Sequence, residues 1–115
     1  TREFYQYNME ILLMRTNADE MTELGQMMAE RLNDAKGPVT VMIPTKGFSH
    51  HIIRETQDID GNSIGSWLQP ETDQAFTDSM HKHLTHGEIK ELDLHINDHE
   101  FADACVEELM KSLEP

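Results

Sequence analysis

Three short segments of the chain carry side chains suited to binding an anion, and each segment follows or ends a predicted strand. Two of the side chains are cations, and several others are hydroxyl or amide donors. The residues are Arg15, Thr16, Lys46, Gly47, Ser49, His95, Asn97 and Asp98. Ligands of an open parallel sheet bind beyond the carboxyl ends of its strands, where helix amino termini also present N–H groups. The pattern therefore predicts a site for a phosphate- or carboxylate-bearing small molecule.

Each of these residues also has an ordinary structural interpretation. Asn17 and Asn97 suit helix caps, and Arg15 and Lys46 suit solvent-exposed charges. The Lys46-Gly47 pair lacks the rest of a Walker phosphate loop, and no Gly-x-Gly-x-x-Gly run is present. No Gly-x-Ser-x-Gly elbow surrounds Ser49. These motifs assign no catalytic residue and no reaction.

Seven histidines raise the question of a metal site. No His-Glu-x-x-His motif and no cysteine pair accompanies them, and these are the usual signatures of zinc ligation. Histidines near the end of a helix are favourable for the helix dipole without any ligand. The sequence therefore predicts no metal site.

The elements that would position the anion-binding residues alternate along the chain. Apolar or β-branched runs predict strands at 9–15, 38–43 and 89–96. Helical patterns predict helices at 18–36, at 71–84 and from 97 or 98 to 113. Strands that alternate with helices indicate a parallel sheet with right-handed crossovers.

The first predicted helix has the clearest boundaries. Asn17 suits the N-cap, with Glu20 three residues later as in a capping box, and the Lys36-Gly37 pair suits its end. One face of the helix is apolar and is expected to lie in the core. Its residues are Met21, Leu24, Met28 and Leu32.

The predicted fold class is α/β, with three αβα layers around a parallel, Rossmann-like sheet. Three strands are few for a sheet covered on both faces, so we expect a fragment of a larger sheet. Residues 1–115 would then be a single subdomain, the carboxy-terminal part of a longer protein, with the upstream domain as its partner. The alternative is a complete minimal domain that pairs with a copy of itself.

Composition and charge limit the function classes. A formal net charge of −13 disfavours nucleic acid as a partner, because DNA binding depends on clustered Lys and Arg. The apolar runs are far too short to span a membrane, so no membrane partner is expected. The single cysteine, Cys105, suits a buried structural thiol, and we expect a cytoplasmic protein.

A long connection runs from Ser49 to Pro70 and leaves the ligand-facing end of the second predicted strand. Asp60-Gly61 within it suits the turn of a small hairpin. Connections of this length are typically functional, and this one carries the only tryptophan. We expect a partly ordered flap that folds over the predicted site or packs against a partner subunit, anchored by Trp67.

The rim segments also match a known family in order and spacing. The matching motifs are Arg15-Thr16, the run from Pro44 to Ser49, Pro70-Glu71-Thr72-Asp73, and the His95-Ile96-Asn97-Asp98 run followed by Phe101-Ala102. Together they resemble the carboxy-terminal stretch of an uncharacterised bacterial, archaeal and plant family. That family includes the ATP-binding amino-terminal region of the tomato mosaic virus resistance protein.

The resemblance implies two α/β subdomains in the intact protein, of which this chain resembles the end of the second. It also implies association with ATP and Mg²⁺ and assembly into a homo-oligomer. Two departures from the family pattern concern carboxylates. Gln69 stands where an Asp is expected before Pro70, and residues 50–53 replace an expected Asp after Ser49.

Overall fold

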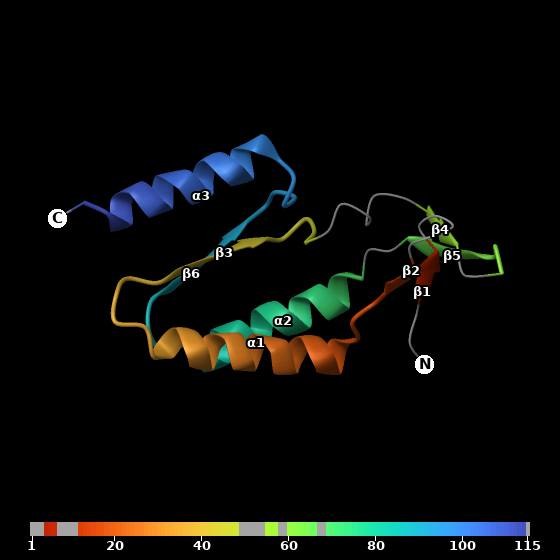
Figure 1. Cartoon of the computed structure of the whole chain (residues 1–115), viewed down its shortest axis with the longest axis horizontal. Coiled ribbons are helices and arrows are strands. Elements are labelled where there is room, and N and C mark those ends of the chain that lie inside the picture. The colour runs from red at the N-terminus through yellow and green to blue at the C-terminus, as the bar shows by residue number, and fades with distance from the viewer. Residues whose placement is uncertain (1–3, 7–11, 49–54, 58–59, 67–68, 115) are drawn as a thin grey trace.

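A parallel pair of strands, β3 (Thr40–Pro44) and β6 (Glu88–Leu92), lies at the centre of the fold. The computed structural model describes residues 4–6, 12–48, 55–57, 60–66 and 69–114. Helices α1 (Ala18–Asn33) and α2 (Pro70–His83) cover one face of the pair, and α3 (His99–Ser112) covers the other (Figure 1). The predicted α/β class with a parallel sheet is confirmed, and the sheet is not closed.

Two small antiparallel pairs lie together at one end of the molecule (Figure 1). One joins β1 (Phe4–Gln6) to β2 (Leu12–Met14), and the other joins β4 (Glu55–Gln57) to β5 (Ser63–Ser66). The predicted turn at Asp60-Gly61 lies between β4 and β5, and the φ of +85° at Gly61 suits glycine. Trp67 and the flap that we expected it to anchor lie outside the described residues.

The prediction that the first strand belongs to the parallel sheet is wrong. Only Leu12–Met14 of that run is described as a strand, and it pairs antiparallel with Phe4–Gln6 rather than parallel with β3. An apolar run of this length is compatible with either kind of pairing. The nearby Phe4–Gln6 segment can pair through a short connection, whereas a parallel neighbour needs a long crossover.

Helix α1 begins as its sequence predicts and ends earlier. Asn17 and Glu20 form a complete capping box, with Asn17 Oδ1 accepting from the Glu20 N–H at 2.9 Å. The helix ends at Asn33, whose side chain donates to the His83 carbonyl and accepts from the Thr85 N–H at 2.7 Å. These bonds join the ends of α1 and α2, so the boundary is set by a tertiary contact rather than by Lys36-Gly37.

Small residues form the contact between α1 and α2. Gly25 and Ala29 are buried there, and a Cβ at Gly25 would lie 2.8 Å from both the Phe76 carbonyl oxygen and the Ser79 Cβ. The Ser79 hydroxyl donates to the Thr22 carbonyl across the same contact at 2.6 Å. The two helices therefore approach closely enough to exclude side chains at this point.

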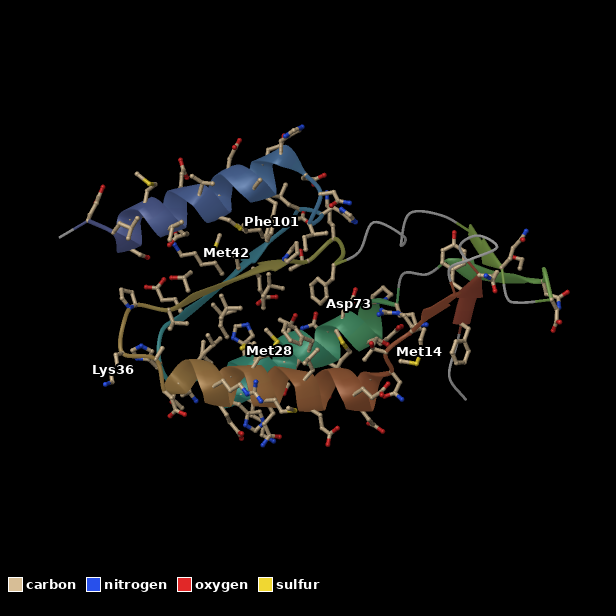
Figure 2. All side chains as sticks on the ribbon, in the orientation of Figure 1. Met14, Met28, Lys36, Met42, Asp73 and Phe101 are labelled. Atoms are coloured by element: carbon tan, nitrogen blue, oxygen red, sulfur yellow. The ribbon has the colours of Figure 1, made fainter. Side chains whose placement is uncertain are left out.

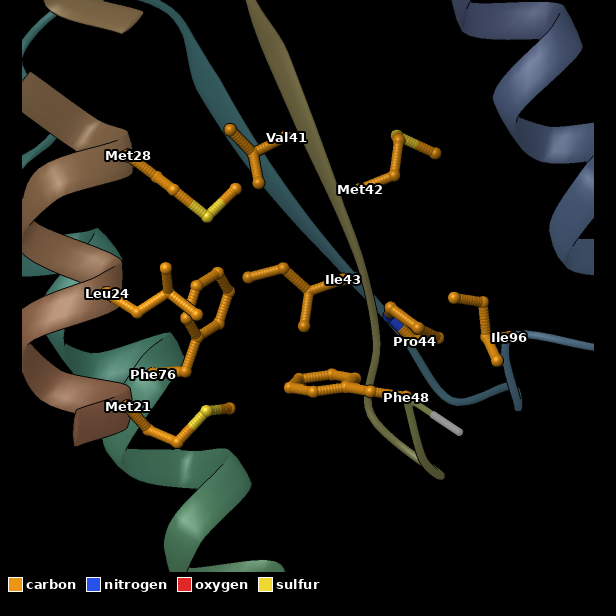
Figure 3. A pocket seen from close by; sticks show the side chains of 10 residues that line it. All are labelled: Met21, Leu24, Met28, Val41, Met42, Ile43, Pro44, Phe48, Phe76 and Ile96. Atoms are coloured by element: carbon orange, nitrogen blue, oxygen red, sulfur yellow. The ribbon is translucent and has the colours of Figure 1, made fainter. Parts of the chain in front are cut away.

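This contact corrects the predicted core face of α1. Met21 is buried as expected, but Leu24 is 43% exposed and Met28 is 41% exposed. The buried positions Met21, Gly25 and Ala29 are spaced by four residues and share one face of the helix, and Gly25 contacts α2 on that face. The Leu24 and Met28 side chains are consequently turned toward β3 instead of into the helix contact (Figure 3).

The core lies on both faces of the parallel strands. Ile43 and Met80 are almost completely buried, and Phe101 of α3 is buried on the opposite face (Figure 2). Phe48 and Phe76 pack edge to face with ring centroids 5.8 Å apart. Cys105 on α3 is half-buried rather than fully buried. Within the described residues, no helix is long and apolar enough to cross a membrane.

Lys90 of β6 and Glu108 of α3 form a hydrogen-bonded ion pair that links the helix to the sheet. The hydrogen bond to Glu108 is the main cause of a raised pKa at Lys90. The same bond lowers the pKa of Glu108, which Lys111 lowers further. Both shifts favour the charged pair in the folded state.

The close contact at Gly25 predicts the effect of adding one methyl group. Gly25→Ala should lower the free energy of unfolding by about 1–2 kcal/mol, since overpacking costs about 1–3 kcal/mol and alanine returns up to ~1 kcal/mol of helix propensity. Gly37→Ala is the control, because no heavy atom lies within 4 Å of its added Cβ. Urea denaturation measures both. A Gly25→Ala variant as stable as wild type would contradict the proposed close contact.

The ion pair predicts a pH-dependent stability. A carboxylate with a lowered folded-state pKa stabilises the fold above its unfolded pKa, and this contribution is lost as the pH falls. Glu108→Gln should therefore lower the melting temperature at pH 7, and the difference from wild type should shrink below the ordinary carboxyl pKa of 4.5. Glu107→Gln, at an exposed neighbouring position, controls for the lost charge. A difference that is constant across this pH range would rule out the pair.

Candidate functional site

The loops that follow β3 and β6 lie side by side at one end of the parallel strands. Gly47 and His95 form a parallel bridge, the Lys46 N–H donates to the Leu94 carbonyl at 3.0 Å, and the Ile96 N–H donates to the Gly47 carbonyl at 3.1 Å. Gly47 is buried and has a φ of +145°, which glycine adopts without strain. The second and third predicted segments are thus neighbours in the fold.

The loop after β6 uses its polar groups internally. The Asp98 carboxylate accepts from the His95 N–H at 2.9 Å, and His95 Nδ1 accepts from the Asn97 N–H at 3.0 Å. A ring nitrogen that accepts carries no proton, so a neutral His95 has its proton on Nε2. These bonds shape the turn that leads into α3, and Asp98 is also the N-cap of that helix.

Arg15 reaches the rim through an ion pair with α2. Its Nη2 donates to Asp73 Oδ1 at 3.1 Å, and both side chains are only 13% exposed. The charge of Arg15 is therefore matched inside the protein. Thr16 separates it from the Asn17 cap, and Ser49 lies outside the described residues.

A groove of about 260 Å³ opens between the loop after β3 and the start of α2. Its surface combines a cation, two hydroxyls, an amide and the paired carboxylate with an aromatic ring. The lining residues are Thr45, Lys46, Phe48, Pro70, Asp73, Gln74 and Thr77. Lys46 Nζ lies 4.0 Å from Asp93 Oδ2, and these two side chains are 58% and 86% exposed.

The amino termini of α1 and α2 offer fewer N–H groups to a ligand at this rim than the sequence predicts. The start of α1 is capped by its own Asn17. The first residue of α2 is Pro70, which has no N–H, and the N–H groups of Thr72 and Asp73 both donate to the Gln69 carbonyl. Hydrogen bonds to a ligand would therefore come mainly from side chains at this edge of the groove.

The expectation that ligands bind beyond the carboxyl ends of the strands did not identify the residues on the α2 side of the groove. Asp73, Gln74 and Thr77 lie on the first two turns of α2, and this expectation covers only residues that follow strands. The available signal was the Pro70-Glu71-Thr72-Asp73 run, in which a proline at N1 marks a helix start beside the rim. In the part of the chain that the structure describes, no three His, Cys, Asp or Glu side chains gather in a way that would hold a metal ion.

Comparison with known protein families identifies relatives of the chain. Residues 1–113 match the C-terminal domain of the Uncharacterised protein family (UPF0261). The chain belongs to this family. The predicted resemblance is thereby confirmed, and the matched region includes every residue that lines the groove.

Relatives of this UPF0261 domain occur in bacteria and in a plant. It is 36% identical over 106 residues to a UPF0261 protein of Mesorhizobium japonicum and 32% identical over 108 residues to one of Rhizobium meliloti. These matches cover 90% and 91% of the chain but 24% and 25% of the relatives. The ToMV resistance protein Tm-1 of Solanum lycopersicum is 32% identical over 113 residues, which is 96% of this chain and 14% of that protein. The chain thus spans about a quarter of the length of the two bacterial relatives.

The Arg15–Asp73 pair predicts a specific energetic coupling. Asp73→Asn should lower the free energy of unfolding by about 1.5–3 kcal/mol, because it removes a charge-assisted hydrogen bond from a mostly buried guanidinium. Arg15→Gln combined with Asp73→Asn should cost less than the sum of the two single changes. Chemical denaturation of the four proteins gives the coupling energy. Strict additivity would show that the two charges do not interact.

Proposed function

We propose that the groove beside Lys46 binds the phosphate or carboxylate group of a small molecule. The observation that carries the proposal is the convergence of Lys46, Thr45, Gln74 and Thr77 around one groove, at the end of the sheet where ligands of such folds bind. The Lys46 ammonium and the second N–H of the Gln74 side-chain amide can donate to an anionic oxygen. The Thr45 and Thr77 hydroxyls donate to the Leu92 and Asp73 carbonyls, so each would have to exchange that partner for a ligand. The UPF0261 domain would act here as a ligand-binding subdomain.

Lys46 is the cation that is available to exchange its partner. Its contact with Asp93 is 4.0 Å long and lies on the surface, where ion pairs contribute little to stability. Arg15, by contrast, is mostly buried against Asp73. We therefore assign ligand charge recognition to Lys46 and a positioning role to Arg15, which holds the start of α2 against the rim.

The size of the groove limits what it can hold. Its volume of about 260 Å³ is below the ~300–1,000 Å³ typical of pockets for drug-sized ligands, so it fits an anionic head group rather than a whole nucleotide. For ATP, which the family resemblance implies, these residues would hold one phosphate group. Its Mg²⁺ and base would need groups outside the groove.

Lys46→Gln in the full-length protein tests this assignment. It should weaken binding of ATP with Mg²⁺ at least about tenfold, the contribution of one charge-assisted hydrogen bond, as measured by calorimetry. Inorganic phosphate should compete with ATP if the phosphate group is what the groove recognises. Lys36→Gln is the matched control, because Lys36 is an exposed lysine in the loop after α1, outside the groove.

Equal affinities of wild type and Lys46→Gln for ATP would overturn the role of Lys46. Absence of binding of both ATP and inorganic phosphate to the wild-type protein would overturn the anion site itself.

A structural or oligomerisation role without a ligand site of its own is the second candidate. The observation that favours it is the number of large apolar side chains left exposed on α1, on α3 and at the C-cap of α3. They are Leu24, Met27, Met28, Val106, Leu109, Met110 and Leu113. Apolar surface of this kind is typical of protein contacts. This role predicts that Lys46→Gln changes neither ligand binding nor assembly.

A further inference from the structure

The free edge of β3 has the features of an interior strand that lacks a neighbour. Among the described residues, β3 pairs only with β6. Its central residues Val41, Met42 and Ile43 are apolar without alternation, the pattern of a strand covered on both faces and paired on both sides. The sequence of β6, Glu88–Leu92, is half polar, and Glu88 and Glu91 are exposed, as is typical of a true edge.

An apolar groove of about 290 Å³ runs along β3. Figure 3 shows that Val41 and Ile43 point toward α1 and α2, whereas Met42 points toward α3. Side chains from both faces of a strand share one groove when the edge between those faces is open. The groove also contains Leu24 and Met28 of α1 and Ile96, each more than 40% exposed. The apolar stripe that the sequence marks as core therefore borders this edge.

The hydrogen-bonding groups of the edge follow from the pairing with β6. The Glu88 N–H donates to the Val39 carbonyl, and the Thr45 N–H donates to the Leu92 carbonyl. Odd-numbered residues of β3 thus face β6, and alternation directs the backbone groups of Thr40 and Met42 to the opposite side. Pro44 lacks the last donor on that side, so an added strand would pair along Thr40 to Met42 and with the Pro44 carbonyl.

We propose that this edge is occupied by a parallel, apolar β-strand from the part of the family architecture that lies outside this chain. The bacterial relatives are about four times as long as the matched region, which spans 24% and 25% of them. A strand from that remainder would pair with Thr40 and Met42, and its side chains would cover the exposed side chains of Leu24 and Met28. The domain is then completed within one polypeptide rather than by a second copy of this chain.

Amide hydrogen exchange in the full-length protein tests the pairing directly. The Met42 N–H should exchange at least about a hundredfold more slowly than an unstructured amide, and so should the Ile43 N–H, which faces β6. A Met42 amide that exchanges freely beside a protected Ile43 would overturn the proposal. Protection that disappears on about a hundredfold dilution would instead indicate a second copy, and would overturn the intramolecular strand.

Proline substitutions provide a second, independent measurement in the same protein. Met42→Pro removes only a donor that faces the free edge, and Met42→Ala controls for the lost side chain. Glu91→Pro and Glu91→Ala form the matched pair on the outer edge of β6. Met42→Pro should melt about 5 °C or more below Met42→Ala, or fail to fold, whereas the Glu91 pair should differ by less. Equal differences in the two pairs would contradict an added strand at β3.

Discussion

The parallel pairing of β3 with β6 is the constraint on which the other features depend. Parallel neighbours cannot be joined by a tight turn, so the chain between them must cross over the sheet, and α2 forms the last part of that crossover. The same pairing brings the ends of both strands to one edge, where Gly47 meets His95. Among the residues that the structure describes, it also leaves β3 with one partner and one open side.

The contact between α1 and α2 determines which side chains face that open side. Gly25 allows the helices to approach, and the Ser79 hydroxyl and the Asn33 side chain satisfy polar groups across the contact. This contact fixes the rotation of α1 about its axis. By burying its small residues against α2, α1 presents Leu24 and Met28 to the edge of the sheet. A close helix contact thus leaves larger apolar side chains for another partner.

The two proposals concern opposite kinds of surface on one small domain. The groove beside Lys46 contains a cation and suits a charged group, whereas the groove along β3 is apolar and suits a strand. Phe48 lines both, and it packs against Phe76 between them. A strand bound along β3 would therefore also restrain Phe48, which forms one side of the groove beside Lys46.

Local patterns determined much of this protein from the sequence alone. The α/β class, the Asn17–Glu20 capping box, the turn at Asp60-Gly61 and the three helices depend on neighbouring residues, and each was predictable from them. The family followed from the order and spacing of short motifs. Tertiary structure alone decided that Leu12–Met14 pairs with Phe4–Gln6, that Arg15 is matched by Asp73, and that the apolar stripe of α1 borders an open strand. These three features depend on residues distant in sequence or on competition between alternative partners. Hydrophobic periodicity predicts that a side chain is buried, and only the packed fold determines which residues bury it.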